Sequence, residues 1–125
     1  MQRYDPLKSP DPEEWLALDE QERIDLVEKY HRRKRIRMPS VKGHAAFHVM
    51  VENQIAMGEK LPVKRKLRQL MDEGLDRHDA IHAIASVLSR QFYHASKRQS
   101  SDPSKAYYAA LEDLTAEIWL KSGEE

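Results

Sequence analysis

The feature that most constrains this chain is a series of helix start and stop signals, which divides it into short segments of helical periodicity. Asp11 followed by Pro12 predicts a helix start, and Asp19 begins the pattern of a capping box. Gly58 and Gly74 occupy positions where helices end. Between these signals apolar residues recur every three or four positions, and we find no run with the period of two that is typical of β-strands. The sequence therefore predicts an all-α fold.

The segments between these signals predict a single-domain bundle of four to five mostly antiparallel helices, because the connections are only a few residues long. The prolines at positions 6 and 10 predict that residues 1–10 form an irregular N-terminal arm of this domain. A short helix after residue 11 leads into a longer one near residue 20, and the two are counted together as the first helix. The further helices are expected at 43–57, 62–74, 77–97 and 103–123. One helix should turn Ile81, Ile84, Leu88 and Phe92 toward the core.

The composition narrows the class of protein further. The chain has 125 residues, of which 40% are apolar and 34% charged, and this length suits one domain with one hydrophobic core. It has no cysteine, which excludes disulfides, thiolate metal sites and cysteine nucleophiles. No apolar run approaches the roughly 18 residues of a membrane span, and the N-terminus has no apolar signal core. We therefore expect a cytoplasmic protein without a membrane partner.

The charge is balanced, with 21 basic and 21 acidic residues, which argues against a nucleic-acid partner held by the overall field. The basic run at residues 32–42 has two interpretations. It is either an RNA or anion contact or a solvated helix end whose charge matches the helix dipole, and the lack of interleaved aromatic residues favours the second. A homodimer is plausible, because a small bundle that leaves one helix face apolar would pair symmetrically.

Four of the six histidines form two pairs at helical spacing, His44 with His48 and His78 with His82. Side chains four residues apart point the same way from a helix, so each pair can bind one ion. A bundle that makes the two helices neighbours brings the four imidazoles together, with Glu52 one turn beyond His48 as a further ligand. Imidazole suits zinc, iron and nickel, so this interpretation predicts one such ion as the cofactor.

A competing interpretation keeps the paired histidines as buried neutral rings in a protein–protein interaction or adaptor module. In the metal-binding interpretation, by contrast, Asp79 and Glu117 are candidates to accept the second N–H of a metal-bound ring. His31 and His94 lie outside the pairs and are interpreted as surface or rim residues. No catalytic residue is predicted, because the chain has no glycine-rich phosphate loop, no Gly-x-Ser-x-Gly motif and no His-Glu-x-x-His motif.

The stretch from HAAFH to HDAIHAI, within residues 40–95, resembles the core of a family of small uncharacterised bacterial proteins with a domain of unknown function. That family has two histidines four apart, then an Asn/Glu-Gln pair, a short amphipathic helix and a His-x-x-x-His motif. The matching residues are His44, His48, Gln54, His78 and His82. The resemblance implies that the histidines matter as a set and supplies no reaction. The pairs are more loosely similar to hemerythrin-like di-iron bundles, but the bridging carboxylates are not at matching positions, so oxygen binding is not predicted.

Overall fold

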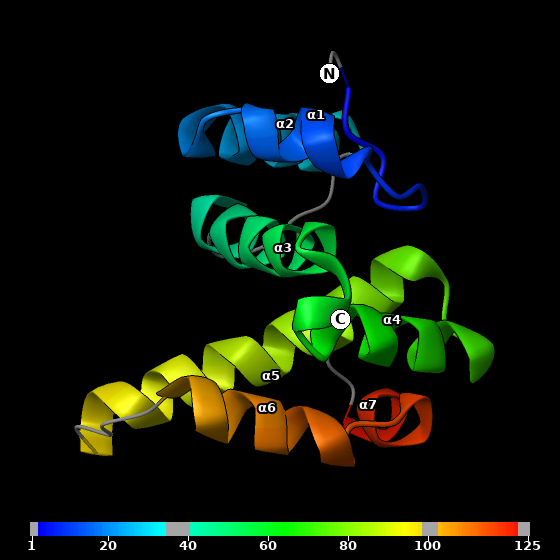
Figure 1. Cartoon of the computed structure of the whole chain (residues 1–125), viewed down its shortest axis with the longest axis vertical. Helices are drawn as coiled ribbons and strands as arrows, with labels where there is room; N and C mark the ends of the chain where they lie inside the picture. The colour runs from blue at the N-terminus through cyan, green and yellow to red at the C-terminus, as the bar shows by residue number, and fades with distance from the viewer. Residues whose placement is uncertain (1–2, 35–40, 99–102, 123–125) are drawn as a thin grey trace.

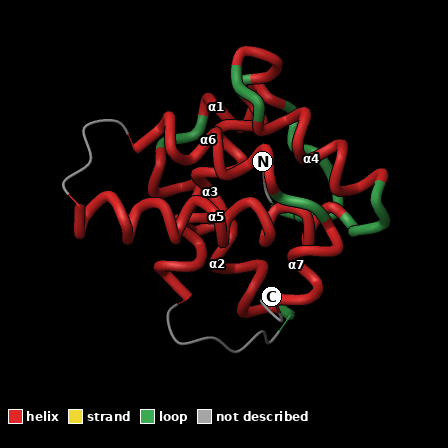
Figure 2. Tube along the Cα trace, turned by 90° about the horizontal axis from the view of Figure 1, so that it is seen from below, coloured by secondary structure: helices red, strands yellow, loops and turns green. Residues whose placement is uncertain are grey.

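The computed structural model describes residues 3–34, 41–98 and 103–122, together with the side chains of these ranges except residues 41–42, 94–98 and 103. Within these ranges the chain forms helices joined by short turns and contains no strand, which confirms the all-α prediction (Figure 2). The elements are α1 (Pro12–Ala17), α2 (Glu20–Arg33), α3 (Val41–Ala56), a 3₁₀ turn (Gly58–Lys60), α4 (Val63–Asp72), α5 (Arg77–Arg98), α6 (Pro103–Asp113) and α7 (Ala116–Ser122). None of the described helices is both long enough and apolar enough to span a membrane.

The helices follow one another in layers along the long axis of the molecule (Figure 1). α1 and α2 lie at one end, α3 is next, α4 and α5 follow, and α6 and α7 lie at the other end. α3 packs against α2 on one side and against α5 on the other. It contributes to both apolar clusters, one shared with the N-terminal arm, α1 and α2 and the other with α4 to α7. The junction of α2, α3 and α5 therefore lies between the two clusters.

The turn between α4 and α5 fixes where α5 begins. Gly74 has a φ of 112°, a left-handed conformation that side chains disfavour, and the Leu75 N–H donates to the Leu70 carbonyl at 3.1 Å. Leu75 is buried, so the chain reverses tightly against the core. Asp76 then accepts a backbone N–H from the first turn of α5. As a result α5 begins beside α3, and Arg77 in its first turn bonds to Glu52 of α3.

The other predicted helix signals have mixed outcomes. The capping box is present, because the Glu22 N–H donates to the Asp19 carboxylate at 2.8 Å and the reciprocal bond also forms. Gly58 has a positive φ and follows the end of α3, as predicted. Asp11 precedes α1 but makes no side-chain capping hydrogen bond. The sequence also predicts a helix break at Met38-Pro39-Ser40 and a helix cap at Asp102, and both lie outside the described residues.

The count of four to five helices was too low, since the described residues contain seven. The expected last helix splits into α6 and α7 at Leu114 and Thr115. Thr115 starts α7 by accepting the Ile118 N–H on its hydroxyl at 3.1 Å, while the Leu114 carbonyl accepts a hydrogen bond from Lys66 of α4. Both interactions satisfy backbone groups that a continuous helix would pair internally. The apolar periodicity across the break concealed it.

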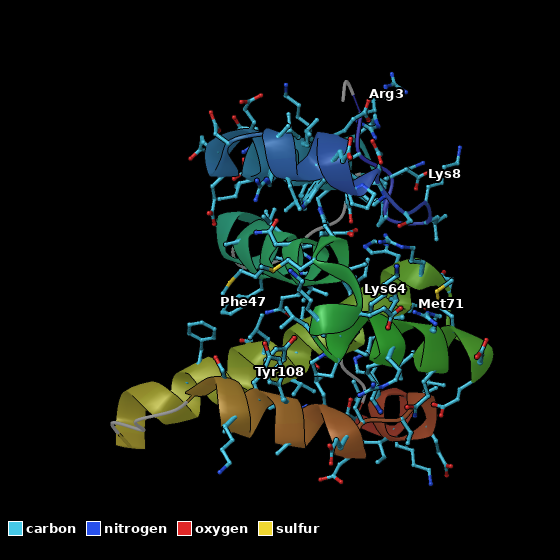
Figure 3. The ribbon with its side chains drawn as sticks, viewed as in Figure 1. Arg3, Lys8, Phe47, Lys64, Met71 and Tyr108 are labelled. Atoms are coloured by element: carbon cyan, nitrogen blue, oxygen red, sulfur yellow. The ribbon has the colours of Figure 1, made fainter. Side chains whose placement is uncertain are left out.

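Phe92 was predicted to face the core, and this prediction is wrong. Its side chain is 47% exposed, and its ring contacts the ring of Phe47 at a centroid distance of 5.8 Å. The reason is the length of α5, whose C-terminal half runs past the end of α3 (Figure 1). Phe47, labelled in Figure 3, is itself only partly buried.

Candidate metal centre

Five imidazoles meet where α2, α3 and α5 come together. α2 supplies His31, α3 supplies His44 and His48, and α5 supplies His78 and His82. The two predicted pairs do face each other, with ring centroids 5.6 Å apart for His48 and His78 and 4.7 Å apart for His44 and His82. The order of the helices in space, which periodicity cannot provide, brings these residues together.

His31 was interpreted as a surface or rim residue, and this interpretation is wrong. Its side chain is fully buried, and its ring centroid lies 4.7 Å from that of His44 and 5.5 Å from that of His48. His31 follows Val27 by four residues on the buried face of α2, so helical periodicity contained the signal. The other unpaired histidine, His94, has a side chain outside the described residues.

The four residues His31, His48, His78 and His82 each offer a ring nitrogen, and these four atoms all lie within 4.8 Å of one another. Nitrogens bound to one zinc ion at about 2.1 Å would be about 3.4 Å apart in a tetrahedron. The rings must therefore turn inward to share a single ion. His44 is not a member of this group, although its Nε2 lies 3.1 Å from the Nε2 of His82.

Hydrogen bonds on the outer side of two rings determine which nitrogen carries the proton. The Nδ1 of His31 lies 2.8 Å from the Val27 carbonyl oxygen. A carbonyl only accepts, so Nδ1 carries the proton and Nε2 keeps its lone pair. That Nε2 is buried and has no hydrogen-bond partner. His31 is therefore held in the tautomer that can bind a metal through Nε2.

His48 is fixed in a similar way by Tyr4 of the N-terminal arm. The Tyr4 hydroxyl lies 2.7 Å from the Nε2 of His48 and donates its proton to the Glu52 carboxylate. Burial, with a further contribution from Glu52, raises the pKa of Tyr4 well above its ordinary value, so the phenol stays protonated. Since the phenol has one proton, it must accept the Nε2–H of His48. The buried Nδ1 of His48 is then a lone pair without a partner.

Glu52, a predicted ligand, is linked to the His48 ring through the Tyr4 hydroxyl. Its two oxygens accept from the Arg77 guanidinium at 2.7 and 2.8 Å, and both side chains are almost completely buried. Arg77 also donates to the Pro6 carbonyl at 2.9 Å, which ties the arm to this network. Such a bidentate pair holds the carboxylate in place for Tyr4. Sequence reasoning missed Tyr4 and Arg77, because neither belongs to a recognisable motif.

The remaining predicted site residues lie elsewhere or stay untested. Glu117 is exposed on α7 and pairs with Lys121, so it is not an acceptor for these rings. Gln54, which matches the family pattern, accepts a hydrogen bond from Tyr107 at 2.6 Å, away from the imidazoles. Asp79 is half-buried in the first turn of α5. Most of the basic run at 32–42 lies outside the described residues.

All five clustered imidazoles are held in the neutral form. Burial, with a further contribution from neighbouring imidazoles, lowers the pKa of His44 and His78 to about 4 and that of His82 to about 2. Burial also lowers the pKa of His31, and lowers that of His48 well below its ordinary value. Neutral imidazole is the form that binds metal ions, so these residues need not lose a proton to do so at neutral pH.

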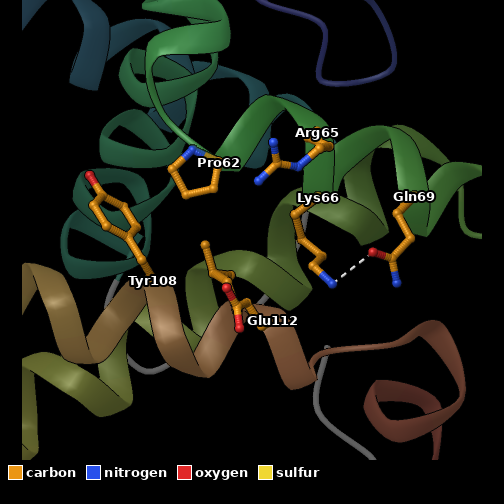
Figure 4. A pocket seen from close by; sticks show the side chains of 7 residues that line it. Pro62, Arg65, Lys66, Gln69, Tyr108 and Glu112 are labelled. Atoms are coloured by element: carbon orange, nitrogen blue, oxygen red, sulfur yellow. Dashed lines mark hydrogen bonds between the residues drawn. The ribbon is translucent and has the colours of Figure 1, made fainter.

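A second polar region lies between α4 and α6 (Figure 4). Its hydrogen bonding differs from that of the histidine cluster. It borders a pocket of about 190 Å³ whose lining includes Arg65, Lys66 and Glu112. The Lys66 ammonium donates to Gln69 at 2.8 Å and to the Leu114 carbonyl at 2.9 Å. The Lys66 ammonium is thus bonded within the protein, as expected of a structural contact.

Comparison with known proteins gives one match. A family model described as "Domain of unknown function (DUF1841)" matches residues 10–113. No curated protein and no solved structure matches the chain. The matched range includes all five clustered histidines, whereas residues 1–9 of the N-terminal arm, Tyr4 among them, precede it.

Proposed function

This chain belongs to the family with the domain of unknown function DUF1841, and we propose that it binds one transition-metal ion through His31, His48, His78 and His82. The family was predicted from the sequence and is confirmed, but it carries no activity that could be transferred. The proposal therefore depends on the geometry of the site and assigns no reaction.

The observation that carries the proposal is a set of ring nitrogens without hydrogen-bond partners. The Nε2 of His31, the Nδ1 of His48 and the Nε2 of His78 are all buried and unpaired. A buried polar atom left without a partner costs about 1–3 kcal/mol, and most proteins avoid it. These three residues belong to the group whose ring nitrogens lie within 4.8 Å of one another, and the unpaired atoms are accounted for if their lone pairs bind a cation. Histidines that serve only packing would be expected to bond through both nitrogens.

The donor set indicates the class of ion. Imidazole nitrogen suits zinc, iron and nickel, whereas calcium and magnesium require mainly oxygen ligands. The carboxylate of Glu52, a predicted ligand, is already bonded to Arg77 and Tyr4. Its role in the proposed centre is to hold Tyr4, and through it the His48 ring, in the orientation that leaves Nδ1 free.

The test is elemental analysis of untagged protein purified without chelators, followed by zinc titration with thermal unfolding. We expect about one ion per chain and a raised melting temperature on adding zinc. His48→Ala and His78→Ala should lose both effects, while Lys66→Ala, which alters a buried polar group on α4, should keep them. Absence of bound metal together with no thermal shift in the wild type would refute the proposal.

The exposed aromatic residues on α5 favour a second function, protein–protein interaction. Phe92 and Tyr93 are 47% and 59% exposed, and exposed apolar surface of this kind can serve as a protein interaction site. In this alternative the protein associates through α5, with a second copy as the first candidate partner. Sedimentation analysis of the wild type and of Phe92→Glu tests it, since a dimer that the substitution dissociates is expected. A wild type that remains monomeric at high concentration would refute the homodimer.

A further inference from the structure

We propose that the metal-loaded centre takes a small monoanion as an additional ligand, and that His44 donates the hydrogen bond that holds this anion. The inference rests on the proposed metal site and goes beyond it by naming the class of exogenous ligand and the residue that recognises it.

The metal-loaded centre would carry a positive charge that no buried side chain balances. Four neutral imidazoles leave the double positive charge of the ion uncompensated. The buried carboxylate of Glu52 is neutralised by the Arg77 guanidinium, so this pair contributes no net charge. The carboxylates of Asp5 and Asp76, whose negative charges favour the protonated form of His78, are exposed to water. A buried charge without a counter-charge is costly, so the loaded centre should attract an anion.

His44 is placed where its ring N–H can donate a hydrogen bond to a ligand on the metal. Its Nε2 lies 3.1 Å from the Nε2 of His82, a distance at which the two rings share one proton. We assign the Nε2 of His82 as its ligand atom in the proposed centre, and with its lone pair on the metal the shared proton belongs to His44. Metal binding then removes the acceptor of that N–H and leaves it directed at the coordination sphere. A ligand anion on the metal would be the natural new acceptor.

One side of the histidine centre is more accessible to solvent than the other. His31 and His48 are fully buried, whereas His44, His78 and His82 are only partly buried. The side of the centre that His44 and His82 form is therefore closer to solvent than the side under the N-terminal arm. A small anion can arrive on this side without displacing Tyr4, which closes the opposite side through His48.

The experiment uses the full chain loaded with cobalt(II), whose visible absorption weakens when a four-coordinate ion gains a ligand, and azide as the probe anion. We expect azide to change the spectrum saturably in the wild type. His44→Phe should bind cobalt as the wild type does but bind azide at least about tenfold more weakly, because a hydrogen bond to a charged group is lost. His44→Gln, which keeps an N–H donor, should recover part of the affinity.

The outcomes separate this inference from the proposed function. Failure of the wild type to bind cobalt would overturn both. Cobalt binding without a spectral response to azide would overturn the inference alone. Equal azide affinities in wild type and His44→Phe would also overturn it. If both His44→Phe and His44→Gln fold but lose cobalt, His44 is itself a ligand and the assigned role is wrong.

Discussion

Two buried polar regions of this protein differ in how their polar atoms are satisfied. At the junction of α4 and α6, Lys66 gives its protons to Gln69 and to the Leu114 carbonyl, the point where α6 stops. At the junction of α2, α3 and α5, three ring nitrogens remain buried without partners. The hydrogen bonds of the first region satisfy a carbonyl at the end of α6. The second region has ring nitrogens whose lone pairs remain available to bind a ligand.

The comparison shows that burial of polar residues alone does not distinguish structure from function. Lys66 is as deeply buried as many core residues, yet its bonds explain its presence. Around His48 the outer contacts, from Tyr4 to Glu52 and Arg77, fix the ring and leave the inner nitrogen free. Outer hydrogen bonds that leave inner lone pairs unused are typical of metal-binding histidines.

The largest effect is expected from breaking the buried ion pair beside the histidines. Glu52→Ala leaves Arg77 buried without a counter-charge and should lower the free energy of unfolding by about 3–5 kcal/mol. The matched control is Glu117→Ala, which removes an exposed pair with Lys121 and should cost less than about 0.5 kcal/mol. Urea unfolding measures both. Equal losses would contradict the view that the Glu52 network supports the histidine centre.

The two regions should also differ in their response to acid. The folded protein holds its clustered imidazoles at lowered pKa values, so the unfolded chain binds more protons below its own histidine pKa of about 6.5. In metal-free protein, stability should be complete above about pH 6.5 and fall as the pH drops toward about 4, where His44 and His78 protonate in the folded state. Denaturant titrations between pH 7 and 5, above the carboxylate range, measure the slope. A flat profile there would refute it, and Lys66→Met should leave the slope unchanged.

A smaller effect is expected from the arm. Tyr4→Phe removes the acceptor of the His48 N–H, and loss of such an outer contact typically weakens metal binding by about 10–100-fold. Tyr107→Phe is the control, since Tyr107 is also a buried tyrosine but bonds to Gln54. Competition with a chelator gives the two zinc affinities. If both variants bind zinc as the wild type does, Tyr4 has no part in the centre.

The smallest effect is expected at the α4–α6 junction. Lys66→Met keeps most of the volume and removes the donor to the Leu114 carbonyl, so the loss of stability should be about 1 kcal/mol. Zinc affinity should not change, because α4 contributes no histidine. A change in zinc affinity measured by chelator competition would show that the two regions are coupled, contrary to the comparison.

Local signals in the sequence predicted the helices, and the two histidine pairs followed from their spacing of four residues. The capping box at Asp19 and the positive φ values of Gly58 and Gly74 are consequences of nearby residues, so they could be anticipated. The split between α6 and α7 could not, because it depends on Lys66, which lies almost fifty residues earlier. Periodicity could have placed His31 on the buried face of α2.

The other members of the centre depend on contacts between distant segments. Tyr4 meets His48 and Glu52 only because the arm folds back over α3, and no motif marks a lone tyrosine in an irregular segment. Arg3 and Lys8, which lie before and after Tyr4 in the sequence, project outward from the arm (Figure 3). Arg77 reads from the sequence as an ordinary residue of a first helical turn. Its partner Glu52 could be singled out, but its part in an ion pair could not.

X-ray absorption at the metal edge of the zinc- or nickel-loaded protein counts and identifies the atoms bound to the ion, so it tests the ligand set itself. We expect four imidazole nitrogens at about 2.0–2.1 Å, with room for one further light atom. Replacing His31 with alanine should remove one imidazole from the spectrum. A shell dominated by oxygen, or a spectrum that the loss of His31 leaves unchanged, would contradict the assignment of His31, His48, His78 and His82 as the metal ligands.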